Sequence, residues 1–186
     1  MRFPFLRAAL ALVALLALSA DARAQFVYSD TTAGGPTFNR PLENGTALSG
    51  TGTNVPYHVL AFSVDAAGTY GFLSGPTTGG FNNFLILYQN AFNPTAALDN
   101  FVIADDDVPQ LGVVQAGFSA PLAVGTNYFL VTTGFNNADF GAFTNIITGP
   151  GNVLAGPAAA VPEPGTLALL GFVLPVGAAA IRRRRA

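Results

Sequence analysis

The chain has 186 residues, a formal net charge of −2 and a hydrophobic fraction of 51%. It contains no cysteine, which excludes disulfides, cysteine-ligated zinc and thiol catalysis. Of its eight basic residues only Arg40 falls within residues 25–160, where it stands against eight carboxylates. One positive against eight negative charges gives that segment about −7, so we expect it to repel nucleic acid.

Residues 1–24 have the organisation of a signal peptide. Arg2 and Arg7 form a short positive region, residues 8–18 are apolar, and a small-x-small pattern ends at Ala24 with Ala22 as its other small residue. The apolar run is too short to span a bilayer, which disfavours an uncleaved anchor. We therefore predict export through the Sec machinery and cleavage after Ala24.

Residues 25–148 are predicted to form one all-β domain, a β-sandwich of the jelly-roll kind with seven or eight strands. Short β-rich runs alternate with turns rich in Gly, Pro, Asn and Thr, and no stretch keeps a helical period. Regular short strands at this spacing are typical of a sandwich. The predicted strands are residues 57–64, 69–74, 84–89, 99–104, 113–119, 127–133 and 141–147, with an edge strand near residues 26–28.

Five motifs of this domain follow the order seen in bacterial pre-peptidase C-terminal-like domains. They are YHVLAFSV (57–64), AGTY (67–70), FLILY (84–88), ADDD (104–107) and LAVGTNYFLV (122–131). The segment resembles that family, whose members are small jelly-roll sandwiches appended to secreted proteases and surface proteins. The resemblance implies a jelly-roll fold and an accessory role outside the cell.

The sequence offers few groups for catalysis, and we predict no catalytic residue and no enzyme activity. His58, the one histidine, lies in a predicted strand, where a packed or hydrogen-bonded residue is the favoured interpretation. No serine has the Gly-x-Ser-x-Gly pattern of a nucleophile elbow. A secreted hydrolase is the less favoured alternative. In such an enzyme a pair of carboxylates would act on a glycoside.

Three consecutive aspartates are the one polar cluster with a metal-binding interpretation. Adjacent carboxylates repel one another, and either solvation in a turn or a hard cation such as Ca²⁺ relieves the repulsion. The cluster lacks the spacing of an EF-hand loop. A structural Ca²⁺ is thus one interpretation and a solvated acidic turn the other, for Asp105, Asp106 and Asp107.

Phenylalanine and asparagine recur together at residues 81–84, 92–94, 135–137 and 140–143. Exposed phenylalanines could stack on sugar rings. We favour the alternative, in which the phenylalanines belong to the core and the asparagines occupy tight turns, because sugar platforms favour Trp and Tyr and the chain has no Trp.

Residues 149–160 are rich in Gly, Pro and Ala, and we interpret them as a flexible linker. A proline-rich motif follows, made of Val161, Pro162, Glu163, Pro164 and Gly165. After it come an apolar run over 166–181, at the short end of what spans a bilayer as a helix, and a basic cluster of Arg182, Arg183, Arg184 and Arg185. The positive-inside rule keeps this cluster cytoplasmic.

Residues 161–186 resemble the PEP-CTERM sorting signal of Gram-negative bacteria. In that family exosortase, a membrane-embedded transpeptidase, is thought to cut near the Pro-Glu-Pro. The resemblance implies an exosortase-type partner and a protein held transiently in the inner membrane, then delivered to the cell surface, the outer membrane or the extracellular matrix. A plain C-terminal membrane anchor is the alternative.

Together these features predict a non-enzymatic exported protein of the surface or the extracellular polysaccharide matrix. A carbohydrate- or Ca²⁺-dependent binding module is the alternative function. We predict no cofactor other than the Ca²⁺ considered above.

Overall fold

The structure, a computed structural model, describes residues 23–108 and 115–156. These ranges hold ten β-strands and no helix. The strands are β1 (Ala24–Thr31), β2 (Thr37–Phe38), β3 (Val55–Val64), β4 (Gly68–Pro76), β5 (Asn83–Gln89), β6 (Phe101–Asp105), β7 (Ala116–Leu122), β8 (Tyr128–Gly134), β9 (Ala142–Gly149) and β10 (Val153–Ala155).

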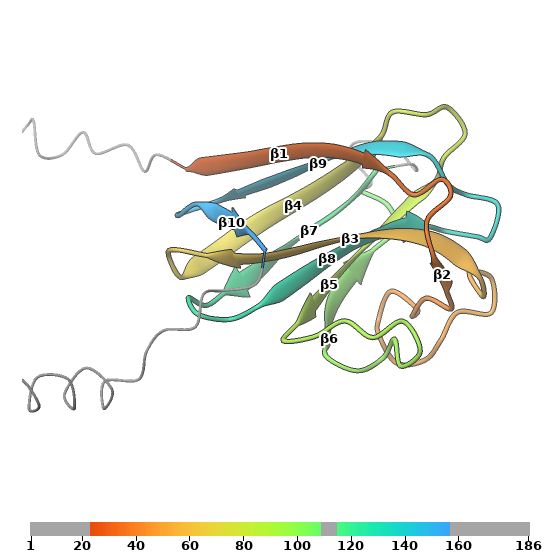
Figure 1. Ribbon diagram of the computed structural model, residues 1–186, viewed down its shortest axis with the longest axis horizontal. Helices are drawn as coiled ribbons and strands as arrows, with labels where there is room; N and C mark the ends of the chain where they lie inside the picture. Colours follow the sequence, from red (N-terminus) through yellow and green to blue (C-terminus); the bar gives the residue numbers. More distant parts are fainter. Residues whose placement is uncertain (1–22, 109–114, 157–186) are drawn as a thin grey trace, which may run out of the picture.

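The strands form two antiparallel sheets packed face to face (Figure 1). The four-stranded sheet has the order β1-β9-β4-β7. The six-stranded sheet has the order β10-β3-β8-β5-β6, with β2 pairing to β3. Most neighbouring strands come from distant parts of the chain, although β5 pairs with β6 and β2 with β3; β1, for example, pairs Tyr28 with Asn145 of β9. A sandwich of this kind buries the alternate side chains of each strand between its layers.

The main core lies between the two sheets. It is built from inward side chains such as Phe62 of β3, Phe72 of β4, Leu87 of β5 and Ile147 of β9, all at most 3% exposed. The alternation is clearest in β9, where every second residue is buried. A two-residue period of this kind is what a strand with one face on a core requires.

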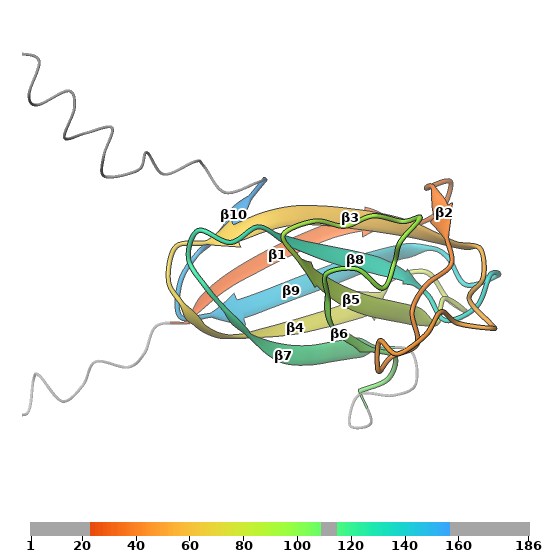
Figure 2. The same ribbon diagram turned by 90° about the horizontal axis from the view of Figure 1, so that it is seen from below.

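A second core covers the outer face of the six-stranded sheet. Phe84, Ile86 and Tyr88 of β5 point into it and meet Phe38 of β2 and Ala97 of the long loop between β5 and β6. Figure 2 shows this loop crossing the sheet on that side. Because β5 faces a core on both sides, its residues from Asn83 to Tyr88 are all buried.

The predicted all-β sandwich is confirmed, including the edge strand near residues 26–28, which is part of β1. All seven other predicted strands occur, with ends shifted by up to three residues. Two further strands were not predicted. β2 has two residues and β10 has three, and both pair with β3. So short a segment carries no period of its own, and its pairing depends on tertiary context.

The expectation of a linker from residue 149 is corrected for the part of it that the structure describes. Gly149 closes β9, and β10 adds Val153 to the six-stranded sheet opposite Val64. Asp65 also accepts hydrogen bonds from the backbone and the side chain of Asn152. The sandwich therefore continues through Ala155, the backbone N–H of Gly156 still donates to the carbonyl oxygen of Ala61, and residues 157–160 of the expected linker lie outside the described residues.

We predict that the second core stabilises the fold as much as the first. Ile86→Ala and Leu87→Ala remove neighbouring β5 side chains, both 0% exposed, from opposite faces of the sheet. Each should lower the free energy of unfolding by about 2–5 kcal/mol in urea titrations. Val102→Ala, at a side chain that is 38% exposed, serves as the control. A cost for Ile86→Ala no larger than the control's would mean that the loops cover the sheet only loosely.

Candidate functional site

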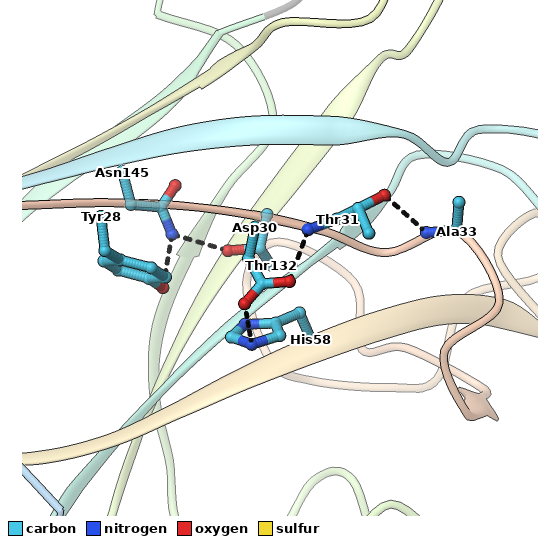
Figure 3. A network of polar contacts seen from close by, with 7 residues as sticks. All are labelled: Tyr28, Asp30, Thr31, Ala33, His58, Thr132 and Asn145. Carbon is cyan, nitrogen blue, oxygen red and sulfur yellow. Dashed lines mark hydrogen bonds and ion pairs between the residues drawn. The ribbon is translucent and has the colours of Figure 1, made fainter.

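A polar network crosses the sandwich where β1 lies over β3 (Figure 3). The side-chain amide of Asn145, only 1% exposed, donates hydrogen bonds to the Tyr28 hydroxyl at 2.7 Å and to Thr132 Oγ1 at 2.8 Å. Nearby, His58 Nε2 lies 3.0 Å from Asp30 Oδ2. Since Tyr28, Asp30 and Asn145 belong to the four-stranded sheet and His58 and Thr132 to the six-stranded sheet, the network ties the two layers together.

Within this network the His58 ring packs against two aromatic rings. Its ring lies 5.6 Å from that of Phe143 and 6.1 Å from that of Tyr28, and its Nδ1 atom is buried without a hydrogen-bond partner. Burial raises the pKa of Tyr28 to about 12, so this phenol stays neutral at physiological pH. The interpretation of His58 as a packed strand residue with a polar partner is confirmed.

The three consecutive aspartates do not converge. Asp105 ends β6, and its Oδ2 accepts a hydrogen bond of 2.8 Å from the backbone N–H of Gly117 in β7. Asp106 instead comes under the electrostatic influence of Arg40 and Glu43. Among the described residues no three His, Asp or Glu side chains are grouped so that they could hold a metal ion. A structural Ca²⁺ at the aspartates therefore stays a prediction without geometric support.

Burial and like charge make Asp106 unfavourable in its ionised form. Burial, followed by the neighbouring Asp107, raises the pKa of Asp106 to about 6, and the attraction of Arg40 offsets only part of the rise. The Oδ1 atoms of Asp106 and Asp107 are buried without hydrogen-bond partners. A carboxylate in this setting costs stability when it ionises.

Arg40 is a buried structural cation that holds the loop after β2 against the sheet. Its Nε and Nη2 both donate to the carbonyl oxygen of Phe135, at 3.0 and 2.6 Å, and Nη1 donates to its neighbour Pro41 at 2.9 Å. The guanidinium lies 4.0 Å from the ring centroid of Phe84 and 5.0 Å from that of Phe135. Gly52 makes room for it, because a Cβ there would come within 2.6 Å of Nε.

The outer face of the four-stranded sheet is uncharged. Its outward side chains alternate with the core residues of β1, β9, β4 and β7, and none of them is acidic or basic. The side chains of this uncharged face are Gln25, Val27, Ser29 and Thr31, then Ala142, Thr144, Ile146 and Thr148, then Thr69, Gly71, Leu73 and Gly75, and finally Gly117, Ser119 and Pro121.

This uncharged face is hollowed by an open groove of about 390 Å³. Gly71 forms its floor, and the hydroxyl groups of Thr148 and Ser119 stand on the two sides of that glycine. A Cβ built on Gly71 would lie 3.1 Å from Thr148 Oγ1 and 3.8 Å from Ser119 Oγ, so the missing side chain creates the hollow. Leu73 and Ile146 continue the lining as an apolar step beside the hydroxyls.

Most of the recurring phenylalanines are core residues, as expected. Phe81, Phe84 and Phe143 are at most 1% exposed, and the exception is Phe140, which is 49% exposed. The described residues therefore offer no row of exposed phenylalanines as a sugar platform. The asparagine turns are also present: the Asn136 side chain accepts a hydrogen bond from the backbone of Ala138.

The predicted targeting residues fall largely outside the described ranges. Ala22, the motif of 161–165 and the basic cluster of 182–185 are not described, while Ala24 is the first residue of β1. Within the described ranges no helix has the length and apolarity that crossing a bilayer requires.

Sequence reasoning missed two features of the surface and the loops. The sequence did contain a signal for the role of Arg40, because the single basic residue of an acidic domain is expected to have a specific partner. No sequence signal indicated the groove, because a glycine in a strand has the same sequence pattern whether it faces a core, forms a bulge or faces solvent.

We predict that Arg40→Lys destabilises the fold although it keeps the charge. A lysine ammonium cannot reproduce the planar fork that bonds the Phe135 and Pro41 carbonyls together. We expect a loss of about 1–3 kcal/mol in urea-induced unfolding. Arg40→Met, which also removes the charge, should cost at least as much. If Arg40→Lys is as stable as the wild type, the charge alone holds this loop.

We predict that Asp106→Asn stabilises the protein at neutral pH. Since the folded-state pKa of Asp106 is raised to about 6, the stability conferred by its protonated form is present below about pH 4 and lost as the pH rises through 6. Solvent screens this half-buried carboxylate, so we expect a gain of only about 1 kcal/mol, or roughly 2–4 °C in Tm, at pH 7.5.

The gain should vanish at pH 4, where the wild-type carboxyl is already neutral. Asp99→Asn, an exposed loop residue, controls for the change in net charge. A lower Tm for Asp106→Asn at pH 7.5 would show that its attraction to Arg40 outweighs its burial.

Comparison with known proteins gives no family for this chain. No family model matches it, and no curated protein matches it. Among solved structures it is similar to the CBM35 from Cellvibrio japonicus Abf62, with 15% sequence identity over 72% of this chain and 100% of that chain. The TM-score is 0.36, and we base no conclusion about fold or function on so distant a likeness.

Proposed function

We propose that this chain is an exported, non-enzymatic protein of the cell surface or the extracellular polysaccharide matrix. Residues 1–24 direct it across the membrane, and an exosortase-type transpeptidase processes it within residues 161–165. The observation that carries the proposal is the order of three parts in residues 161–186: a Pro-Glu-Pro motif, an apolar run and an arginine cluster. The prolines keep the backbone extended for a protease, and the apolar run with the arginine cluster halts the chain in a membrane.

The fold is compatible with both processing steps. Cleavage after Ala24 would leave Gln25 to Thr31 of β1 paired with β9, losing only the Ala24–Gly149 pair. At the other end β10 stops at Ala155, and residues 156–160 separate it from the motif. Both cuts would therefore leave the two cores intact.

A structural rather than catalytic role is supported by how the described polar groups are used. His58 is paired with a carboxylate, Asp105 with a backbone N–H, and Arg40 with two backbone carbonyls. These contacts hold strands and loops to one another. We also propose that the domain is an accessory jelly-roll module, as its resemblance to pre-peptidase C-terminal-like domains implies.

The intact mass of the protein from separate cell fractions of its native host tests the proposal. We expect a surface or extracellular species that begins at Gln25 and ends within residues 161–165, alone or joined to a further group. A double variant, Pro162→Ala with Pro164→Ala, removes the extended backbone that a protease would bind and should retain its tail in the inner membrane. Pro157→Ala, outside the motif, is the matched control and should be processed normally.

A wild-type species that keeps Arg182 to Arg185 in the inner membrane would overturn the sorting proposal. The protein would then be an anchored domain, and the matrix role would fall with it. Processing of the double variant at the wild-type rate would show that the prolines are not what the protease recognises.

A further inference from the structure

We propose that the groove on the uncharged face of the four-stranded sheet binds a neutral polysaccharide chain. This inference deepens the proposed matrix role by assigning it a surface and a ligand class. The site consists of Gly71 and Leu73 on β4, Ser119 on β7, and Ile146 and Thr148 on β9.

The lining of the groove suits an uncharged sugar. Thr148 and Ser119 place two hydroxyl groups at the sides of a floor that has no side chain, where they can donate to and accept from sugar hydroxyls. Leu73 and Ile146 lie directly opposite each other on neighbouring strands and offer an apolar surface for the C–H face of a ring. The pairing of a few polar groups with an apolar floor is the usual chemistry of a small-ligand site.

Charge selects a neutral ligand over an acidic one. The domain carries about −7, and none of the outward side chains of this face is basic, so it has nothing to neutralise a uronate, sulfate or phosphate. An acidic polymer would meet the negative potential of the whole domain as it approached. A neutral chain meets no such barrier and loses no charge solvation when it binds.

The dimensions of the uncharged face favour a linear polymer over a second copy of this protein. Four strands of about eight residues cover a flat area of roughly 19 Å by 26 Å, or about 500 Å². A stable protein–protein interface buries about 800 Å² on each partner. A second copy would have to add contacts beyond this sheet face to reach a standard interface, whereas a single glycan chain fits within its length.

The opposite sheet does not offer an equivalent surface, because the second core and its loops cover its outer face. Of the described residues beyond its four strands, Val108 after β6 reaches the uncharged face and lines the groove beside Gly117. Val27, 54% exposed in β1, is its most exposed large apolar side chain, and it lies directly opposite Ile146 at the edge of the groove. The apolar step thus extends from Leu73 through Ile146 to Val27, across three neighbouring strands.

Native affinity electrophoresis of the purified full chain tests the inference, in a detergent without a sugar headgroup. The gels contain dextran, a (1→3)-β-glucan or a galactomannan as neutral probes, or alginate as an acidic one. We expect retardation by at least one neutral polymer and none by alginate. Thr148→Glu, whose side chain would extend over the Gly71 floor, should weaken that binding at least tenfold.

Thr144→Glu is the matched control, because Thr144 lies on the same strand and the same face outside the groove and takes the same added charge. It should bind like the wild type. Ser119→Glu, from the other side of the groove, replaces Thr148→Glu if urea titration finds that variant unfolded. The inference is overturned if no neutral polymer retards the wild type, if alginate binds better, or if all the glutamate variants bind alike.

Light scattering on the same samples tests whether a second copy of this protein occupies the face instead of a glycan. A wild-type dimer that Thr148→Glu converts to a monomer would assign the face to self-association and overturn the glycan assignment. None of these measurements depends on where the chain is exported or whether its tail is cut. Failure here would leave the sorting proposal standing, and failure of sorting would leave the binding result standing.

Discussion

The fold depends on burying both faces of β5 in the six-stranded sheet. A chain without cysteine has no disulfide to restrict its unfolded state, so apolar burial must supply most of the stability. β5 meets this requirement by contacting the inter-sheet core through Leu85 and Leu87 and the outer core through Phe84, Ile86 and Tyr88. The long loops are thus part of the packed structure: Tyr88, for example, donates its hydroxyl to the carbonyl oxygen of Ala97 in the loop after β5.

The outer faces of the two sheets differ in what covers them and in charge. The six-stranded sheet uses its outer face to hold loops, which bring with them Arg40, Glu43 and the acidic groups near Asp106. The outward side chains of the four-stranded sheet carry no charge. An acidic domain with one neutral face can remain soluble through its charge while leaving a surface available for an uncharged partner.

The sequence pattern predicted the sandwich and most of its strands, because alternation and turn residues are local signals. It could not predict β2 and β10, whose few residues become strands only through the edges of β3. The aspartate cluster was visible in the sequence, but the composition could not reveal that Asp105 accepts a hydrogen bond from Gly117 or that Asp106 is partly buried. The groove depends on which face Gly71 occupies, and that follows from register with Thr148 and Ser119.

The burial of Arg40 has a consequence for how the domain would respond to one class of protease. Proteases of the trypsin type cut after lysine or arginine, and the chain has no lysine. Between Arg23 and Arg182 the one arginine precedes Pro41, a bond that resists these enzymes, and its side chain is 3% exposed. Even when unfolded, residues 24–181 would offer such a protease no ordinary cleavage site, so loss of the fold would not by itself expose the domain to this class of enzyme.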